Sequence, residues 1–182
     1  MGYFPNLMIK NILITGMPRS GKSTILNKLI SEFKHKVGFV TNEVRENGER
    51  IGFEIETSTG DKSLLASVNL KTNLKVSKYF VNIINLDKII QKVSVYANGD
   101  LLFVDEIGQM ELFSEKFKGL VLNYLDSQNM CIATISKIYQ DDFIKQIKSR
   151  KDVILVEIEE GNRNEKENQL RNLIKKIKVN IK

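Results

Sequence analysis

Residues 16–23 read Gly-Met-Pro-Arg-Ser-Gly-Lys-Ser and match the phosphate-binding pattern G-x-x-x-x-G-K-[ST]. Residues 9–15, just before it, are apolar and β-branched, which is typical of a buried strand. After it, apolar residues recur at helical spacing: Ile25, Leu26, Leu29, Ile30 and Phe33. A strand, a glycine-rich turn and a helix together direct backbone N–H groups and the positive end of the helix dipole at an anion. The sequence therefore predicts a site for a nucleoside triphosphate.

The chemistry of such a loop assigns roles to its side chains. Lys22 is expected to neutralise the β and γ phosphates, and the Ser23 hydroxyl to hold Mg²⁺. Arg19 lies inside the loop, and the sequence leaves open whether it contacts the γ-phosphate or faces water. We expect every residue of the loop to contribute to nucleotide binding: Gly16, Met17, Pro18, Arg19, Ser20, Gly21, Lys22, Ser23 and Thr24.

Length and composition fit a single domain over residues 1–182. The net charge of +6 is modest, and the lysines of residues 175–182 suggest a solvated helix face more than a nucleic-acid contact. Cys131, the single cysteine, cannot form an internal disulfide, which fits a reducing compartment. No apolar stretch approaches the roughly 18 residues of a membrane span. We therefore expect a cytoplasmic protein without a membrane partner.

Apolar patterns along the rest of the chain alternate between strand and helix periods. Strands are expected at residues 37–41, 101–104, 130–135 and 153–158. Helices are expected around residues 86–93, from about residue 114, around 143–147 and over 170–177. This order predicts an α/β phosphate-loop fold, with three α/β/α layers around a mostly parallel sheet. Ligands of such sheets bind at the carboxyl ends of the strands.

An antiparallel β insert is expected at residues 42–84. Asn47-Gly48 stands between two β-type runs, which is a strong signal for a hairpin. Further strands are expected at residues 64–68 and 79–84, after a turn at residues 58–61. The insert therefore interrupts the α/β alternation.

The segment 101–106 is a hydrophobic strand that ends in two acids. Downstream of a phosphate-binding loop, Asp105 is expected to coordinate Mg²⁺ directly or through water. Glu106 is a candidate general base for the attacking water, and Glu111 is the alternative. Arg45 is a candidate arginine finger, and an ion pair with Glu43 or Glu54 inside the hairpin is the other interpretation.

Together these motifs resemble the THEP-type nucleoside-triphosphate phosphatases, also called cancer-related nucleoside-triphosphatases. The resemblance rests on the phosphate loop and on three blocks: Thr41-x-Glu43-Val44-Arg45-Glu46-x-Gly48-x-Arg50-x-Gly52-Phe53, Asp105-Glu106-Ile107-Gly108-x-Met110-Glu111-Leu112, and Asn162-Arg163. It implies Mg²⁺-dependent hydrolysis of several triphosphates (ATP, GTP, CTP and UTP) to diphosphate and phosphate, with slow turnover. The family usually has glycine at the position of Arg19 and more often lysine at that of Gln109.

Three questions stay open at this stage. Asn162 and Arg163 either contact the base or cap the last helix. A second enzymatic hypothesis is a small-molecule kinase with its acceptor site in the insert. A non-enzymatic hypothesis is a nucleotide-controlled interaction protein, and the lack of an Asn-Lys-x-Asp motif counts against a GTPase-type switch. The sequence indicates no oligomeric state.

Overall fold

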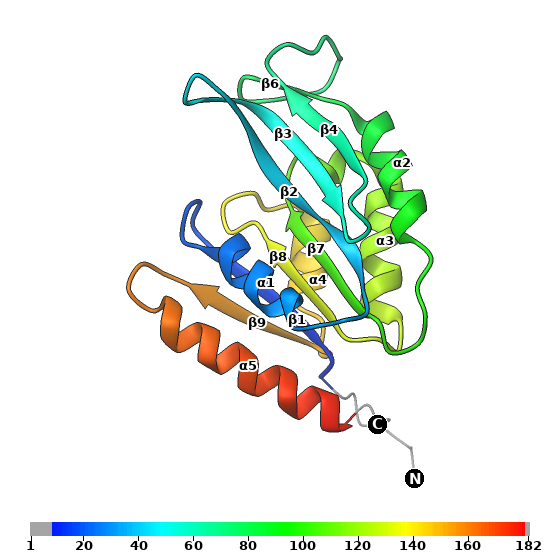
Figure 1. Ribbon diagram of the computed structural model, residues 1–182, viewed down its shortest axis with the longest axis vertical. Coiled ribbons are helices and arrows are strands. Elements are labelled where there is room, and N and C mark those ends of the chain that lie inside the picture. Colours follow the sequence, from blue (N-terminus) through cyan, green and yellow to red (C-terminus); the bar gives the residue numbers. More distant parts are fainter. Residues whose placement is uncertain (1–8, 181–182) are drawn as a thin grey trace.

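A computed structural model describes residues 9–180 and contains a nine-stranded sheet covered by helices on both faces (Figure 1). The strands are β1 (Asn11–Gly16), β2 (Lys36–Glu46), β3 (Glu49–Thr57), β4 (Lys62–Ser67), β5 (Lys75–Val76), β6 (Tyr79–Val81), β7 (Leu101–Ile107), β8 (Cys131–Ile135) and β9 (Val153–Ile158). The helices are α1 (Lys22–Ser31), α2 (Ile83–Val93), α3 (Glu115–Asp126), α4 (Asp142–Lys148) and α5 (Arg163–Asn180), with a 3₁₀ turn η1 (Glu111–Phe113).

The sheet has the order β5-β6-β4-β3-β2-β7-β8-β1-β9. Strands β2, β7, β8, β1 and β9 are parallel to one another. From β2 outward, β3, β4, β6 and β5 each pair antiparallel with their neighbours. Strands β1 and β7, which precede the two predicted halves of the site, are separated by β8 alone, so their carboxyl ends lie near each other.

Alternation along the parallel strands feeds two hydrophobic cores. Ile12 and Ile14 of β1 point to the face covered by α1 and α5, and Leu13 points to the face covered by α2, α3 and α4. On each face, apolar side chains of the sheet are buried against the helices that cover it, and Figure 1 shows these two helix layers. The predicted three-layer α/β/α fold is confirmed.

The antiparallel strands are part of the main sheet rather than a separate layer. β2 pairs parallel with β7 through residues 36–40 and antiparallel with β3 over its whole carboxyl half. The predicted hairpin turn at Asn47-Gly48 is present, with both residues at positive φ. β2 therefore joins the parallel and the antiparallel strands into one mixed sheet. The share of parallel strand pairs in this sheet is lower than the sequence predicted.

The predicted strand at residues 79–84 is too long. The strand ends at Val81, because the Asn82 side chain accepts a hydrogen bond from the backbone N–H of Asn85 and caps α2. The short strand β5 was not predicted, since two residues carry no periodic signal.

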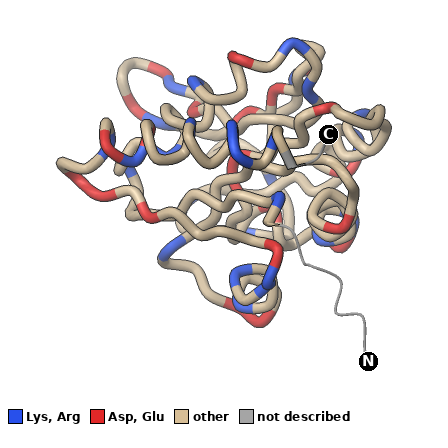
Figure 2. The backbone as a smooth tube through the Cα atoms, turned by 90° about the horizontal axis from the view of Figure 1, so that it is seen from below, with Lys and Arg blue, Asp and Glu red and all other residues tan. Residues whose placement is uncertain are grey.

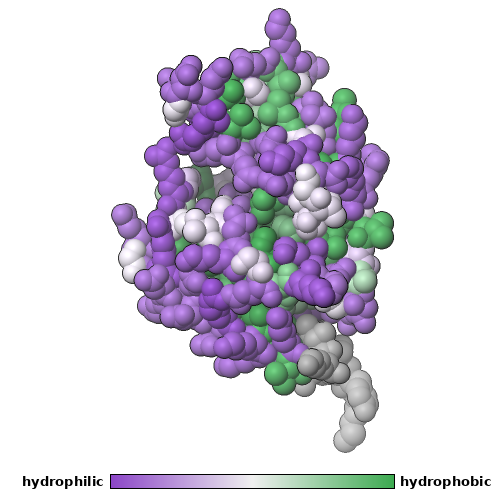
Figure 3. Space-filling model, viewed as in Figure 1, coloured by the Kyte–Doolittle hydropathy of each residue, from purple (hydrophilic) through white to green (hydrophobic). Residues whose placement is uncertain are grey.

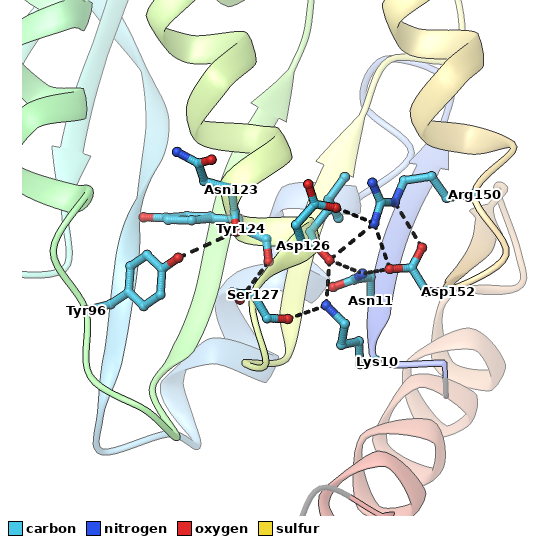
Figure 4. A network of polar contacts seen from close by, with 10 residues as sticks. Lys10, Asn11, Tyr96, Asn123, Tyr124, Asp126, Ser127, Arg150 and Asp152 are labelled. Atoms are coloured by element: carbon cyan, nitrogen blue, oxygen red, sulfur yellow. Dashed lines mark hydrogen bonds and ion pairs between the residues drawn. The ribbon is translucent and has the colours of Figure 1, made fainter. Parts of the chain in front are cut away.

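A polar network joins the amino ends of β1 and β9 to the end of α3 (Figure 4). Lys10 donates to carbonyl groups at the end of α3, and Asn11 donates to Asp152 over 2.9 Å. Arg150 pairs with Asp152 and with Asp126 at 2.8 Å each. These cations stabilise the negative end of the α3 dipole. The network therefore lies at the amino ends of the parallel strands, whereas the phosphate-binding loop follows the carboxyl end of β1.

Basic and acidic residues are interspersed along the backbone drawn in Figure 2, in keeping with the modest net charge. Over residues 9–180, none of the helices combines the length and the apolar character needed to cross a bilayer.

Candidate active site

A cavity of about 1020 Å³ lies at the carboxyl ends of the parallel strands. Figure 3 shows the molecule hollowed between the antiparallel strands, at the top of the view, and the rest of the sheet. Most of the phosphate-binding loop forms one wall, and the ends of β7 and β8 form the floor. Residues of β2, β3 and the β5–β6 turn form the opposite wall. Such a volume is at the upper end of the usual range for small-molecule sites, about 300–1,000 Å³.

Two glycines let the loop follow a tight path against its surroundings. Gly16 has φ +151°, and a Cβ there would lie 2.3 Å from the carbonyl oxygen of Ile158. Gly21 has φ +98°, and a Cβ there would lie 2.8 Å from Nε of Arg163. Arg19 also has positive φ, at 66°, which is a costly conformation for a side chain other than glycine. A glycine at this position would relieve that strain.

Lys22 begins α1 and is almost fully buried. Its Nζ atom donates to the carbonyl oxygens of Gly16 and Met17 over 3.1 and 3.2 Å, so the ammonium group lies across the loop. It also lines the cavity, beside Ser23 and Thr24. This ammonium group and the positive end of the α1 dipole would together stabilise a bound anion.

Ser23 and Asp105 connect the loop to the end of β7. The Ser23 hydroxyl donates to Oδ1 of Asp105 over 3.1 Å, and the Thr134 hydroxyl donates to the same oxygen. Burial raises the pKa of Asp105, and these hydrogen bonds and the charge of Lys22 lower it by less. Hydroxyl and carboxylate oxygens are the ligands that Mg²⁺ prefers.

The donor set fits Mg²⁺ better than a transition metal. Within residues 9–180, no three His, Cys, Asp or Glu side chains are grouped to hold a metal ion. Mg²⁺ needs no such cage, because it usually takes one or two protein ligands and completes its shell with water and substrate phosphates. Ser23 and Asp105 could therefore hold it only together with a nucleotide.

Glu106 and Glu111 both line the cavity beside Asp105. Burial raises the pKa of Glu106, the charge of Lys22 lowers it by less, and Asp105 raises it further. Burial raises the pKa of Glu111 to about 8, against a weaker lowering by backbone hydrogen bonds. A carboxylate with a raised pKa is a stronger base than an ordinary one, which suits Glu106 to accepting a proton. Glu111, with a pKa of about 8, keeps its own proton at neutral pH in the nucleotide-free protein.

Arg163 holds the loop from outside. Its Nε atom donates to the carbonyl oxygen of Ser20 over 2.7 Å, and Nη2 donates to that of Arg19 over 3.1 Å. The Asn162 side chain accepts a hydrogen bond from the backbone N–H of Glu159 over 2.9 Å and so folds the turn before α5. The contacts of both residues are thus with backbone groups of the two loops beside the site.

Arg45 does not reach the cavity. Its guanidinium pairs with Glu43 at 2.6 Å and donates to the carbonyl oxygen of Gly48 over 2.8 Å. This is the hairpin ion pair that was the alternative to an arginine finger. The cavity wall contains Arg50 instead, the cross-strand partner of Arg45.

The structure thus brings most of the predicted residues together: Pro18, Arg19, Gly21, Lys22, Ser23, Thr24, Asp105, Glu106 and Arg163 line one cavity. Met17 and Ser20 line a second cavity of about 480 Å³ on the other side of the loop. Sequence reasoning assigned no role to Thr134, Arg50 or Phe53. Arg50 and Phe53 belong to the Arg50-x-Gly52-Phe53 block, and this block was the sequence pattern that could have identified them as site residues.

A glycine-rich loop between β1 and α1, faced by an acidic strand end, defines a phosphate-loop nucleotide-binding protein. A family model described as NTPase matches residues 11–171. The nucleoside-triphosphatase THEP1 of Thermotoga maritima is 42% identical over 166 residues, which cover 90% of this chain and 95% of that protein. The THEP1 of Methanocaldococcus jannaschii is 37% identical over 139 residues, 72% of this chain and 81% of that protein.

Two solved structures are similar to this one. The crystal structure of THEP1 from Aquifex aeolicus has a TM-score of 0.78 and 30% identity and covers 90% of this chain and 98% of its own. The solution structure of a human cancer-related nucleoside triphosphatase has a TM-score of 0.78 and 29% identity, with coverages of 91% and 97%. The chain belongs to the NTPase family that includes the THEP1 proteins. The predicted family and enzyme class, a nucleoside-triphosphatase, are confirmed.

Proposed function

We propose that this enzyme hydrolyses the common nucleoside 5′-triphosphates, ATP, GTP, CTP and UTP, to diphosphate and phosphate with the help of Mg²⁺. The observation that carries the proposal is the meeting of Lys22, Ser23, Asp105 and Glu106 in one cavity, with Ser23 hydrogen-bonded to Asp105. The relatives named nucleoside-triphosphatase support the same activity.

In this proposal the loop from Gly16 to Thr24 wraps the phosphates with its backbone N–H groups, and Lys22 neutralises the β and γ phosphates. Ser23 and Asp105 would hold Mg²⁺. There it would neutralise part of the negative charge of the phosphates. Arg163 supports the loop directly, and Asn162 folds the turn before α5, so in this proposal both contribute to nucleotide binding indirectly.

Glu106 orients the attacking water and accepts its proton. The water oxygen forms a bond to the γ-phosphorus as the bond from that phosphorus to the β–γ bridging oxygen breaks. The diphosphate leaves with the electron pair of the broken bond, and the water proton goes to Glu106. The raised pKa of Glu106 suits it to this task, because a base that binds its proton more tightly removes it more readily.

A kinase is the second candidate, because the cavity extends beyond the loop to Phe53, Val76 and Ser77 of the antiparallel strands. An acceptor hydroxyl bound there would replace water as nucleophile.

Product analysis separates the two. Purified protein is incubated with Mg²⁺ and each triphosphate, with and without nucleoside acceptors, and the products are resolved by chromatography. Hydrolysis predicts equal amounts of diphosphate and inorganic phosphate without any acceptor. Diphosphate formed only with an acceptor, together with a phosphorylated acceptor, would contradict hydrolysis and establish a kinase.

A further inference from the structure

Two arginines of the β2–β3 hairpin share one carboxylate. Arg45 Nη2 lies 2.6 Å from Oε2 of Glu43, and Arg50 Nη1 lies 2.6 Å from Oε1. Of the two, Arg50 lines the cavity that contains Lys22. We propose that Arg50 binds the terminal phosphate of the triphosphate from the wall opposite the loop. This inference rests on the proposed function and names the residue that distinguishes triphosphate from diphosphate.

Arg50 is held in place by contacts that leave part of its guanidinium open. Its Nε atom donates to the Tyr79 hydroxyl over 3.0 Å, and its Cζ atom lies 5.1 Å from the centroid of the Phe53 ring and 5.7 Å from that of Tyr79. Among hydrogen bonds within residues 9–180, none uses Nη2 of Arg50. The side chain is about one third exposed. A preorganised guanidinium with open N–H donors suits a phosphate oxygen.

The charges around the cavity create a need for such a cation. Four carboxyl groups line it: Glu43, Asp105, Glu106 and Glu111. A triphosphate adds several negative charges, and of the cations beside the loop, Arg163 is committed to backbone carbonyls. Lys22 and Arg19, which also lines the cavity, both belong to the loop side. Arg50 lies on the far wall and can neutralise the end of the phosphate chain that points away from the loop.

The shared carboxylate explains how Arg50 can turn toward a phosphate at little cost. Hydrogen bonds from Arg50 and Arg45 hold the pKa of Glu43 below its usual range. If Arg50 releases Glu43, Arg45 still pairs with it at 2.6 Å and no carboxylate is left without a cation. Arg45 is thus the structural partner of Glu43, and Arg50 is the arginine available to substrate.

The test compares Arg50→Ala and Arg50→Lys with the matched control Arg45→Ala. Affinities for a non-hydrolysable triphosphate analogue and for the diphosphate are measured with Mg²⁺ by calorimetry, together with phosphate release at saturating triphosphate. We expect both Arg50 variants to lose affinity for the triphosphate about tenfold or more while keeping that for the diphosphate. Phosphate release should fall by at least a similar factor. Arg45→Ala leaves Glu43 to be solvated by water when Arg50 turns away, so it should change the ratio of the two affinities far less than either Arg50 variant.

Arg50→Ala also removes contacts with two rings, so its melting temperature is recorded. Arg50→Lys preserves charge and most of the packing and decides the question if Arg50→Ala does not fold. A wild-type ratio of affinities in Arg50→Lys and in any folded Arg50→Ala would overturn the proposal, as would a loss confined to Arg45→Ala. If the wild-type protein binds triphosphate but releases no phosphate, hydrolysis fails as the function, and the affinity ratio still tests Arg50.

Discussion

The hydroxyl group of Ser23 donates to Oδ1 of Asp105 over 3.1 Å, although the two residues lie 82 positions apart in the chain. The contact joins the first turn of α1 to the end of β7, and both side chains line the main cavity. It brings together the hydroxyl and the carboxylate that a magnesium site beside a triphosphate requires.

Asp105→Asn is expected to lower activity mainly through Mg²⁺, because the amide keeps the shape of the side chain and loses its charge. The Mg²⁺ concentration for half-maximal phosphate release should rise about tenfold or more, and excess Mg²⁺ should restore part of the rate. A titration of the rate with MgCl₂ checks this. An unchanged half-maximal concentration would remove Asp105 from the metal site.

Glu106→Gln should lower kcat by about 10²–10⁴, the usual effect of losing a general base. Affinities for nucleotide and Mg²⁺ should stay close to wild type, because the substitution does not change Lys22, Ser23 or Asp105. Single-turnover kinetics with a parallel binding measurement separates the two effects. If kcat is unchanged in Glu106→Gln and falls in Glu111→Gln, Glu111 is the base.

Glu111 should make the stability of the nucleotide-free protein depend on pH. The folded chain keeps the Glu111 proton up to about pH 8, whereas the unfolded chain releases it near the ordinary value of 4.5. The folded state therefore binds more protons between these values, and the contribution of Glu111 to the free energy of unfolding falls as pH rises from about 4.5 to about 8.

Glu111→Gln removes this titration while preserving the shape of the side chain. The variant should gain stability relative to wild type as pH rises from 5 to 8, by an amount on the order of 1 kcal/mol or more. Urea unfolding of both proteins at the two pH values, without Mg²⁺ or nucleotide, measures the difference. Parallel pH profiles for the two proteins would show that Glu111 is ionised in the fold.

Local patterns predicted the elements that carry a strong periodic signal. The phosphate-binding loop between β1 and α1 and the acidic end of β7 follow from sequence, because turn chemistry and apolar runs are local. The end of β6 was misplaced, because Asn82 both follows an apolar run and caps α2, and only the hydrogen bond to Asn85 decides between these roles.

The choice between the two hairpin arginines could not be made from sequence. Arg45 and Arg50 are cross-strand partners, and a register shift between Val44 and Arg45 alters the direction of the side chains locally. Which of them faces the cavity depends on that irregularity and on the position of Tyr79, which comes from another strand. The hydrogen bond from Arg163 to the loop could not be predicted either, because the two segments are far apart in the sequence.

Hydrolysis of triphosphates in this cavity is tested most directly by measuring phosphate release by wild-type protein and by Lys22→Ala prepared in the same way. The lysine lies across the loop and is its principal cation, so its loss should weaken triphosphate binding and abolish turnover while circular dichroism shows an intact fold. We expect Mg²⁺-dependent phosphate release by wild type, its loss in EDTA, and none above background in Lys22→Ala. Equal rates for the two proteins, both folded, would contradict hydrolysis in this cavity.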